Sequence, residues 1–173
     1  MRNNQPVTQR ERSFPAQQRL ISTTDLKGVI TYCNEAFIEI SGFSRDELIR
    51  APHNLVRHPD VPPAVFSHMW TTLKQGKPWM GIVKNRCKSG DHYWVFAHIT
   101  PTLNEHSQIV GYHSNRRSPD RAAVNKVRGV YETLLRAEQK FQNPREQIQA
   151  GLPVFAEYLR SMKMTYEELV FAL

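Results

Sequence analysis

Cysteine and long apolar runs are both scarce in this sequence. Two cysteines occur among 173 residues, Cys33 and Cys87, which excludes a disulfide framework and a cysteine zinc site. The N-terminus lacks the apolar core of a signal peptide, and the chain has no apolar run near the roughly 18 residues that a membrane span needs. We therefore expect a cytoplasmic protein with no membrane span.

Motifs of catalysis and nucleotide binding are also missing. The chain contains no G-x-S-x-G, H-E-x-x-H, P-loop or G-x-G-x-x-G pattern, and no nucleophile stands beside a base. His53, His58 and Asp60 are close in sequence, but they lie in a proline-broken stretch without recognised metal-ligand spacing. We expect neither a catalytic centre nor a metal site, so the protein is not expected to be an enzyme.

The positive charge is in excess but is not concentrated. The formal net charge is +7, and only a modest gathering of basic residues occurs between Arg116 and Arg128. No arginine-rich run, helix-turn-helix or RNP motif accompanies it. A solvated basic surface is therefore expected rather than a nucleic-acid partner.

What the sequence does contain is a dense series of strand and helix signals between residues 19 and 118. β-rich runs occur at 20–24, 29–33, 79–87, 92–100 and 109–116. Helix signals lie between the second and third runs, at a cap on Asn34, a capping box from Ser44, and a segment from Pro62 to Gly76. This order predicts an α+β domain whose five-stranded antiparallel sheet has its helices inserted between strands 2 and 3. Residues 1–18 are polar and aperiodic, and we expect an irregular arm.

A helical extension is predicted for residues 119–173. Ser118-Pro119-Asp120 reads as a helix start, and apolar residues follow at helical spacing, at Val124, Val127, Tyr131 and Leu134. Capping signals follow at Asn143 and at Thr165–Glu168, and Pro153 is predicted to begin another amphipathic helix. Two interpretations of the apolar seam compete: it packs on its own domain, or it joins a second copy in a homodimer through these helices.

Two segments carry chemistry of their own. In the strand at 79–87 the alternation of side chains puts Trp79 and Asn85 on one face, where the indole and the amide suit the face and polar edge of a flavin or purine ring. The loop ending in Arg57-His58-Pro59-Asp60 combines a cation, a titratable ring and a carboxylate. From the residues alone, a core tryptophan and an amide bonded to a loop are the favoured explanation of Trp79 and Asn85, and a weak surface ion pair would explain Arg57 and Asp60.

The arrangement of motifs resembles a PAS sensor domain. The motifs are Asn34-Glu-Ala-Phe37, Ile40-Ser-Gly-Phe43, Asn54-Leu-Val-Arg-His-Pro-Asp60, Trp79-Met-Gly-Ile-Val-Lys-Asn85 and Gly90-Asp-His-Tyr-Trp-Val95. Over residues 7–118 they are similar in particular to the FAD-binding PAS domains of bacterial aerotaxis receptors. The N-C-R-F-L-Q motif of light-sensing LOV domains does not occur, so no photochemical thiol adduct is expected.

The resemblance implies a non-covalently bound FAD whose redox state reports oxygen or energy status. It assigns flavin binding to Arg57, His58 and Asp60, and by looser correspondence to Asn34, Trp70, Trp79, Asn85 and Tyr93. Two alternatives stay open: a haem-binding PAS oxygen sensor, and a ligand-free module for protein interaction or dimerisation. Flavin-dependent enzymology is a third and weaker alternative.

The resemblance also implies a signalling partner. Aerotaxis receptors continue into membrane and signalling segments that these 173 residues do not contain. We therefore expect output through another protein, such as a chemoreceptor or a kinase, reached through the C-terminal helices or the sheet. The last strand is a point of difference, because His113-Ser-Asn-Arg-Arg117 is more polar than the aliphatic strand typical of the family.

Overall fold

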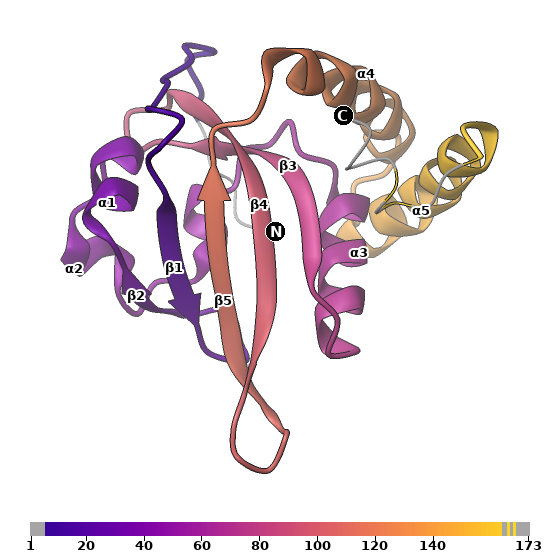
Figure 1. The fold of residues 1–173 in the computed structure, drawn as a ribbon. Helices are drawn as coiled ribbons and strands as arrows, with labels where there is room; N and C mark the ends of the chain where they lie inside the picture. Colours follow the sequence, from indigo (N-terminus) through magenta and orange to yellow (C-terminus); the bar gives the residue numbers. More distant parts are fainter. Residues whose placement is uncertain (1–5, 164–165, 167, 169–173) are drawn as a thin grey trace.

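A single antiparallel sheet organises the structure, a computed structural model that describes residues 6–163, 166 and 168. Its strands are β1 (Leu20–Thr24), β2 (Ile30–Cys33), β3 (Trp79–Arg86), β4 (His92–Leu103) and β5 (Ile109–Arg117). Their spatial order is β2-β1-β5-β4-β3, so the last strand in sequence lies at the centre of the sheet (Figure 1). The α+β fold with five antiparallel strands is confirmed.

Three of the four helices between β2 and β3 begin where the sequence signals place them, and the short 3-10 helix in the proline-broken stretch was not predicted. They are α1 (Glu35–Ser41), α2 (Arg45–Leu48), the 3-10 helix η1 (His53–Val56) and α3 (Pro63–Lys74). Asn34 caps α1 by accepting a hydrogen bond from the Phe37 backbone, and Ser44 and Glu47 form the predicted capping box of α2. A proline at the first position starts α3, where its missing N–H costs nothing.

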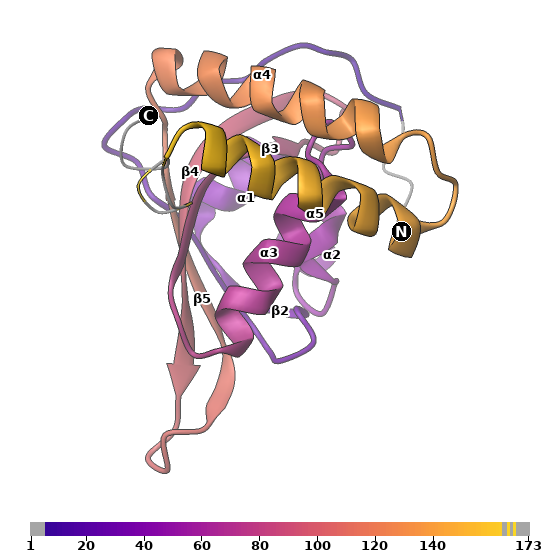
Figure 2. The ribbon, with the colours of Figure 1, turned by 90° about the vertical axis from the view of Figure 1, so that its right-hand side faces the viewer.

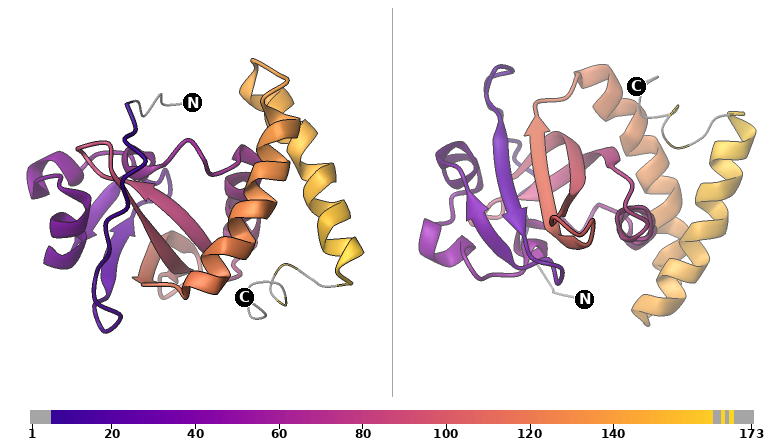
Figure 3. Two further views of the ribbon diagram at one scale, coloured as in Figure 1. Left: turned by 90° about the horizontal axis from the view of Figure 1, so that it is seen from above. Right: turned by 60° about the horizontal axis from the view of Figure 1, so that its bottom comes forward.

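The C-terminal extension is a hairpin of two long helices, α4 (Arg121–Glu138) and α5 (Pro144–Ser161). The helices run side by side (Figure 3), and Figure 2 shows α5 lying between α4 and α3. The predicted seam residues Val124, Val127, Tyr131 and Leu134 are all buried in the common core. Tyr131 also donates a hydrogen bond to the Ile82 carbonyl of β3 at 2.5 Å. The seam therefore packs on its own domain.

Two details of the predicted extension are wrong. Asp120, not Ser118, is the N-cap of α4, and its side chain makes no capping bond. Pro153 does not begin a helix but lies inside α5. The helix tolerates it because Gln149, whose carbonyl loses its partner, lies on the exposed side with Pro153 itself. The predicted capping box at Thr165–Glu168 lies outside the described residues.

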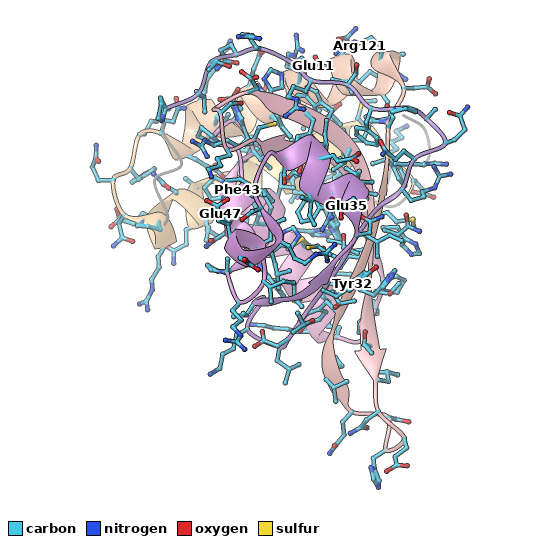
Figure 4. The ribbon with its side chains drawn as sticks, turned by 90° about the vertical axis from the view of Figure 1, so that its left-hand side faces the viewer. Glu11, Tyr32, Glu35, Phe43, Glu47 and Arg121 are labelled. Atoms are coloured by element: carbon cyan, nitrogen blue, oxygen red, sulfur yellow. The ribbon has the colours of Figure 1, made fainter. Side chains whose placement is uncertain are left out.

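The N-terminal arm runs along the end of the sheet. Arg12 and His92 join the arm to β4 through a backbone hydrogen bond of 2.7 Å, and Phe14 is buried. Figure 4 shows Glu11 beside Arg121, and the two form an ion pair of 3.0 Å that ties the arm to the start of α4. Both cysteines are buried, as the strand pattern predicts. Among the described helices, none is long and apolar enough to cross a membrane.

Candidate ligand-binding cavity

A cavity of about 300 Å³ lies between α3, the η1 segment and the inner face of the sheet. Its walls come from the turn after β1, from η1, from α3 and from β3, β4 and β5. The lining residues comprise Thr24, Lys27, Gly28, Pro52, His53, Asn54, Val56, Arg57, Phe66, Met69, Trp70, Leu73, Val83, Asn85, Val95, Ala97, Ile99, Tyr112, Ser114 and Arg116. Apolar and aromatic side chains dominate, with a few polar groups among them, which is the usual composition of a small-molecule site.

The charges around this cavity all have one sign. Lys27, Arg57 and Arg116 contribute to its wall, and no aspartate or glutamate does so among the described lining residues. In a space walled partly by hydrocarbon, three cations without a carboxylate create a positive potential. The cavity is therefore suited to a ligand that carries negative charge or several acceptor oxygens.

Arg116 is the most unusual of these cations because it is buried in the middle of the sheet. The residue is 3% exposed, and one of its nitrogens, Nη2, donates to Ser22 Oγ at 2.7 Å. Its other terminal nitrogen, Nη1, is buried without a hydrogen-bond partner among the described residues. Burial lowers the pKa of Arg116 to about 10, which leaves the guanidinium charged at neutral pH. Arg116 is thus a buried cation with an unused donor beside a cavity.

His53 accepts from the same guanidinium. Its Nε2 lies 2.6 Å from Arg116 Nη2, and since an arginine nitrogen only donates, the imidazole must accept there and carry its proton on Nδ1. Burial and the charge of Arg116 lower the pKa of His53 to about 3, so the ring is neutral. The ring also stacks on Phe37, which fixes its plane. Because the ring is neutral and held in place, it adds no counter-charge for Arg116.

Arg57 reaches the cavity from the edge of the sheet. Its backbone forms an isolated antiparallel bridge with Asn85 of β3, so the loop after η1 is joined to the strand that carries the predicted amide. Its guanidinium lies 3.9 Å from the centroid of the Phe66 ring, which also lines the cavity. Arg57, Asn85 and Trp70 are the predicted ligand-binding residues that the structure brings together around this space.

Asp60 lies on the opposite side of β3. Its carboxylate binds Lys84 Nζ at 2.7 Å, and Lys84 belongs to the strand face that alternates away from Asn85. The Arg57–Asp60 segment therefore wraps around the edge strand, with the cation toward the cavity and the carboxylate behind it. His58, between them, is completely buried, and its Nδ1 accepts from the Asp60 backbone at 3.1 Å.

The other predicted residues lie outside the cavity lining. Trp79 is buried beneath α3, where its indole N–H donates to His68 at 3.3 Å and its ring stacks on Tyr166. Tyr93 is fully buried opposite Asn85 in the β3–β4 ladder. Asn34 bonds the Ile21 backbone and caps α1. These residues hold the elements around the cavity and do not form its wall.

The sequence interpretation did not identify Arg116, His53 and Ser114 as cavity residues. The signal was present in the polar last strand, because alternation along β5 turns Ser114 and Arg116 inward while His113 and Arg117 face the other way. A buried arginine in a central strand is costly unless something uses its charge. The polar residues that distinguish β5 from the aliphatic strand typical of the family, Ser114 and Arg116, thus line the cavity.

The fold and the cavity together define an α+β domain with a small-molecule type of cavity, and comparison with known proteins gives its family. The family model described as the PAS fold matches residues 30–116. This chain belongs to the PAS family. It is 47% identical over 128 residues to the aerotaxis receptor of Escherichia coli strain K12, covering 74% of this chain and 25% of the receptor.

A regulatory protein and a solved structure are also similar to this chain. A nitrogen fixation regulatory protein of Klebsiella pneumoniae is 35% identical over 97 residues, covering 56% of this chain and 20% of that protein. The chain thus spans a quarter or less of the length of these relatives. Among solved structures, a light-oxygen-voltage domain matches with a TM-score of 0.59 at 16% identity, over 66% of this chain and 87% of that one. This last similarity shows the fold alone.

Proposed function

We propose that this chain is a redox-sensing PAS module that binds FAD non-covalently in the cavity between α3 and the sheet. The observation that carries the proposal is Arg116, a buried guanidinium that has an unused donor and faces a space free of carboxylates among the described residues. A buried polar donor needs a partner, and an acceptor-rich ligand supplies one. The similarity to an aerotaxis receptor supports the same proposal.

The cavity residues suit a flavin ring in shape and chemistry. Phe66, Trp70 and Tyr112 provide aromatic walls, and Arg116 with Asn85 provides donors for ring carbonyls. A volume of about 300 Å³ accommodates a ring system rather than a whole dinucleotide. We therefore assign the charged part of the ligand to the mouth, where Lys27 is exposed and available for a phosphate. When bound, a flavin supplies a redox centre whose hydrogen-bonding edge changes with its oxidation state.

Haem is the competing ligand, and the histidines argue against it. His53 is the histidine among the described lining residues, and its Nε2 already accepts from Arg116. His68 accepts from Trp79, and His58 is buried away from the cavity lining. An iron ion at His53 would lie beside a buried cation, which is electrostatically unfavourable. Flavin binding requires no such rearrangement.

We further propose that residues 19–118 are the sensor domain, residues 1–18 its arm and residues 119–173 its output extension, acting in the cytoplasm on a protein partner. The similarity to an aerotaxis receptor and to a nitrogen fixation regulatory protein supports this signalling role. Since α4 packs its apolar seam on its own sheet, a homodimer through the C-terminal helices would use their remaining faces. Sedimentation of the purified chain tests that association: a monomer at all concentrations contradicts it.

Titration of the ligand-free chain with FAD tests the ligand assignment. Flavin fluorescence should be quenched at a one-to-one ratio in the wild type, and Arg116→Met should weaken binding at least tenfold. Arg117→Met is the matched control, because Arg117 neighbours Arg116 on the strand but lies on the exposed face. If FAD does not bind, or binds both variants alike, the ligand assignment is wrong.

A further inference from the structure

A buried carboxylate joins the helical hairpin to the start of α3. Glu138, in the last turn of α4, is 1% exposed, and its Oε1 accepts a hydrogen bond of 2.8 Å from the Ala64 backbone. Ala64 lies in the first turn of α3, where backbone N–H groups lack helical partners and favour a negative charge. The second oxygen, Oε2, is buried with no hydrogen-bond partner among the described residues.

The neighbouring helix leaves room for this contact by having a glycine. A Cβ atom on Gly151 of α5 would lie 2.2 Å from Glu138 Oε1 and 2.9 Å from the Ala64 side chain. The carboxylate therefore fits only where α5 presents bare backbone. Three helices, α3, α4 and α5, meet at this one side chain.

The same carboxylate lies within the electrostatic reach of a cavity residue, Arg57, whose guanidinium packs over Phe66 on α3, the helix that donates to Glu138. Among the described residues, Arg57 is the charged group that acts on Glu138. Ala64 of α3 and Gly151 of α5 also face the carboxylate, but neither residue has a titratable side chain. Arg57 in turn lines the cavity with Phe66 and is bridged to Asn85. Arg57 thus belongs to the wall of the proposed ligand site, and its charge also acts on the carboxylate that holds the hairpin.

We propose that Glu138 is a positioning residue that links the ligand state of the cavity, through Arg57, to the docking of the α4–α5 hairpin. The inference rests on the proposed ligand site. A ligand oxygen that attracts the Arg57 guanidinium weakens its interaction with Glu138. The buried carboxylate then takes up a proton or leaves its place between α3 and α5. Because coupling is reciprocal, undocking of the hairpin must change ligand affinity by the same factor.

Burial brings the pKa of the Glu138 carboxyl close to neutral pH. Desolvation raises the pKa of Glu138 to about 7, against the lowering influence of the Ala64 N–H and of Arg57. Loss of the Arg57 interaction should therefore raise the pKa further. In the undocked hairpin the exposed carboxyl returns to an ordinary value, so docking weakens as pH rises from about 4.5 to about 7, by up to about tenfold per pH unit.

Carbon-13 NMR of the glutamate carboxyl groups measures this directly. The Glu138 signal is assigned by its loss in Glu138→Gln, and its titration is followed with and without saturating FAD. We expect a midpoint near neutral pH in the free chain and a rise of at least half a pH unit with FAD. An ordinary midpoint in the free chain, or one that bound FAD does not move, overturns the proposal.

The arginine variants separate this proposal from the ligand assignment. In the free chain, Arg57→Gln should raise the Glu138 midpoint without any ligand, whereas Arg57→Lys, which keeps the charge, should leave it close to that of the wild type. Glu132→Gln, on an exposed position of α4, is the control for charge removal from the same helix. If the wild type does not bind FAD, the proposed function fails. The Arg57→Gln titration still decides the coupling, and an unmoved midpoint there refutes it.

Discussion

Arg116 and His53 are joined by a contact of 2.6 Å between Nη2 of the arginine and Nε2 of the imidazole. Arg116 carries the single positive charge of this buried pair. His53 is neutral, because burial and the charge of Arg116 lower its pKa to about 3. Folding tolerates this arrangement at a cost in stability, and the cavity beside it is where a ligand can offset that cost.

Replacing Arg116 by methionine should stabilise the ligand-free chain while abolishing tight FAD binding. Methionine keeps the apolar stem and removes a buried charge, so we expect the free energy of unfolding to rise by about 1–3 kcal/mol. Ser22 and His53, 3.2 Å apart, can still pair with each other. Urea denaturation and an FAD titration on the same sample check both effects. A variant that loses stability and binding together would indicate that Arg116 is structural.

Asp60 should act on stability and not directly on the ligand. Asp60→Asn removes the negative partner of Lys84, a buried ammonium that also lies over the Trp94 ring. We expect a loss of about 1–3 kcal/mol, because a buried charge is left without its counter-charge. Adding Lys84→Met should restore most of it, and FAD affinity should recover with stability. Failure of the double variant to recover FAD binding would place Asp60 in the ligand site itself.

The slope of stability with pH should report three buried groups. The pKa values of His53 and His58 are lowered to about 3 and about 4, and that of Glu138 is raised to about 7. Between pH 4.5 and 6.5 the unfolded chain therefore binds a proton at each histidine that the folded chain does not, and the folded chain binds one at Glu138. Counting these groups, stability rises with pH by about 1.4 kcal/mol per unit.

Variants separate the two signs. His58→Gln should lower the slope of stability against pH by about 1.4 kcal/mol per unit, the contribution of one proton. Glu138→Gln should raise the slope by the same amount. Urea denaturation at several pH values in this window gives the slope for each variant relative to the wild type. Equal slopes in the wild type and both variants would mean that His58 is not held neutral and that Glu138 is not held protonated in the folded chain.

Two glycine substitutions should have opposite effects on the helical hairpin. Gly151→Ala places a Cβ against Glu138 and Ala64, so α5 should separate from α3 and stability should fall by roughly 1–3 kcal/mol. Gly129→Ala, with nothing within 4 Å of its Cβ, should stabilise α4 by about 0.5–1 kcal/mol. Thermal unfolding and protease resistance of the α4–α5 turn check both. The hairpin contact is wrongly described if the two variants behave alike.

Local signals in the sequence predicted the elements well because caps and strand alternation depend on near neighbours. Asn34 and Ser44 start their helices as expected, and the alternation along β3 directs Asn85 to the cavity. Contacts between residues distant in the sequence cannot be predicted from such local signals. Nothing local distinguishes Trp79, which pairs with His68 in the core, from a tryptophan that stacks on a ligand.

Two further features required the folded structure. The polarity of β5 is visible in the sequence, but the burial of Arg116 depends on the central position of this strand in the sheet. The contact between Glu138 and Ala64 spans 74 residues and leaves no pattern in either segment. Interactions of this kind depend on how elements pack, and periodicity does not record packing.

Whether this cavity holds a flavin is best tested by the absorption spectrum of the chain purified without added cofactor. Heat release and chromatography then identify any chromophore. We expect a yellow protein that releases FAD, and a colourless Arg116→Met variant. A haem spectrum, or a wild-type chain that stays colourless after incubation with FAD, would contradict the account.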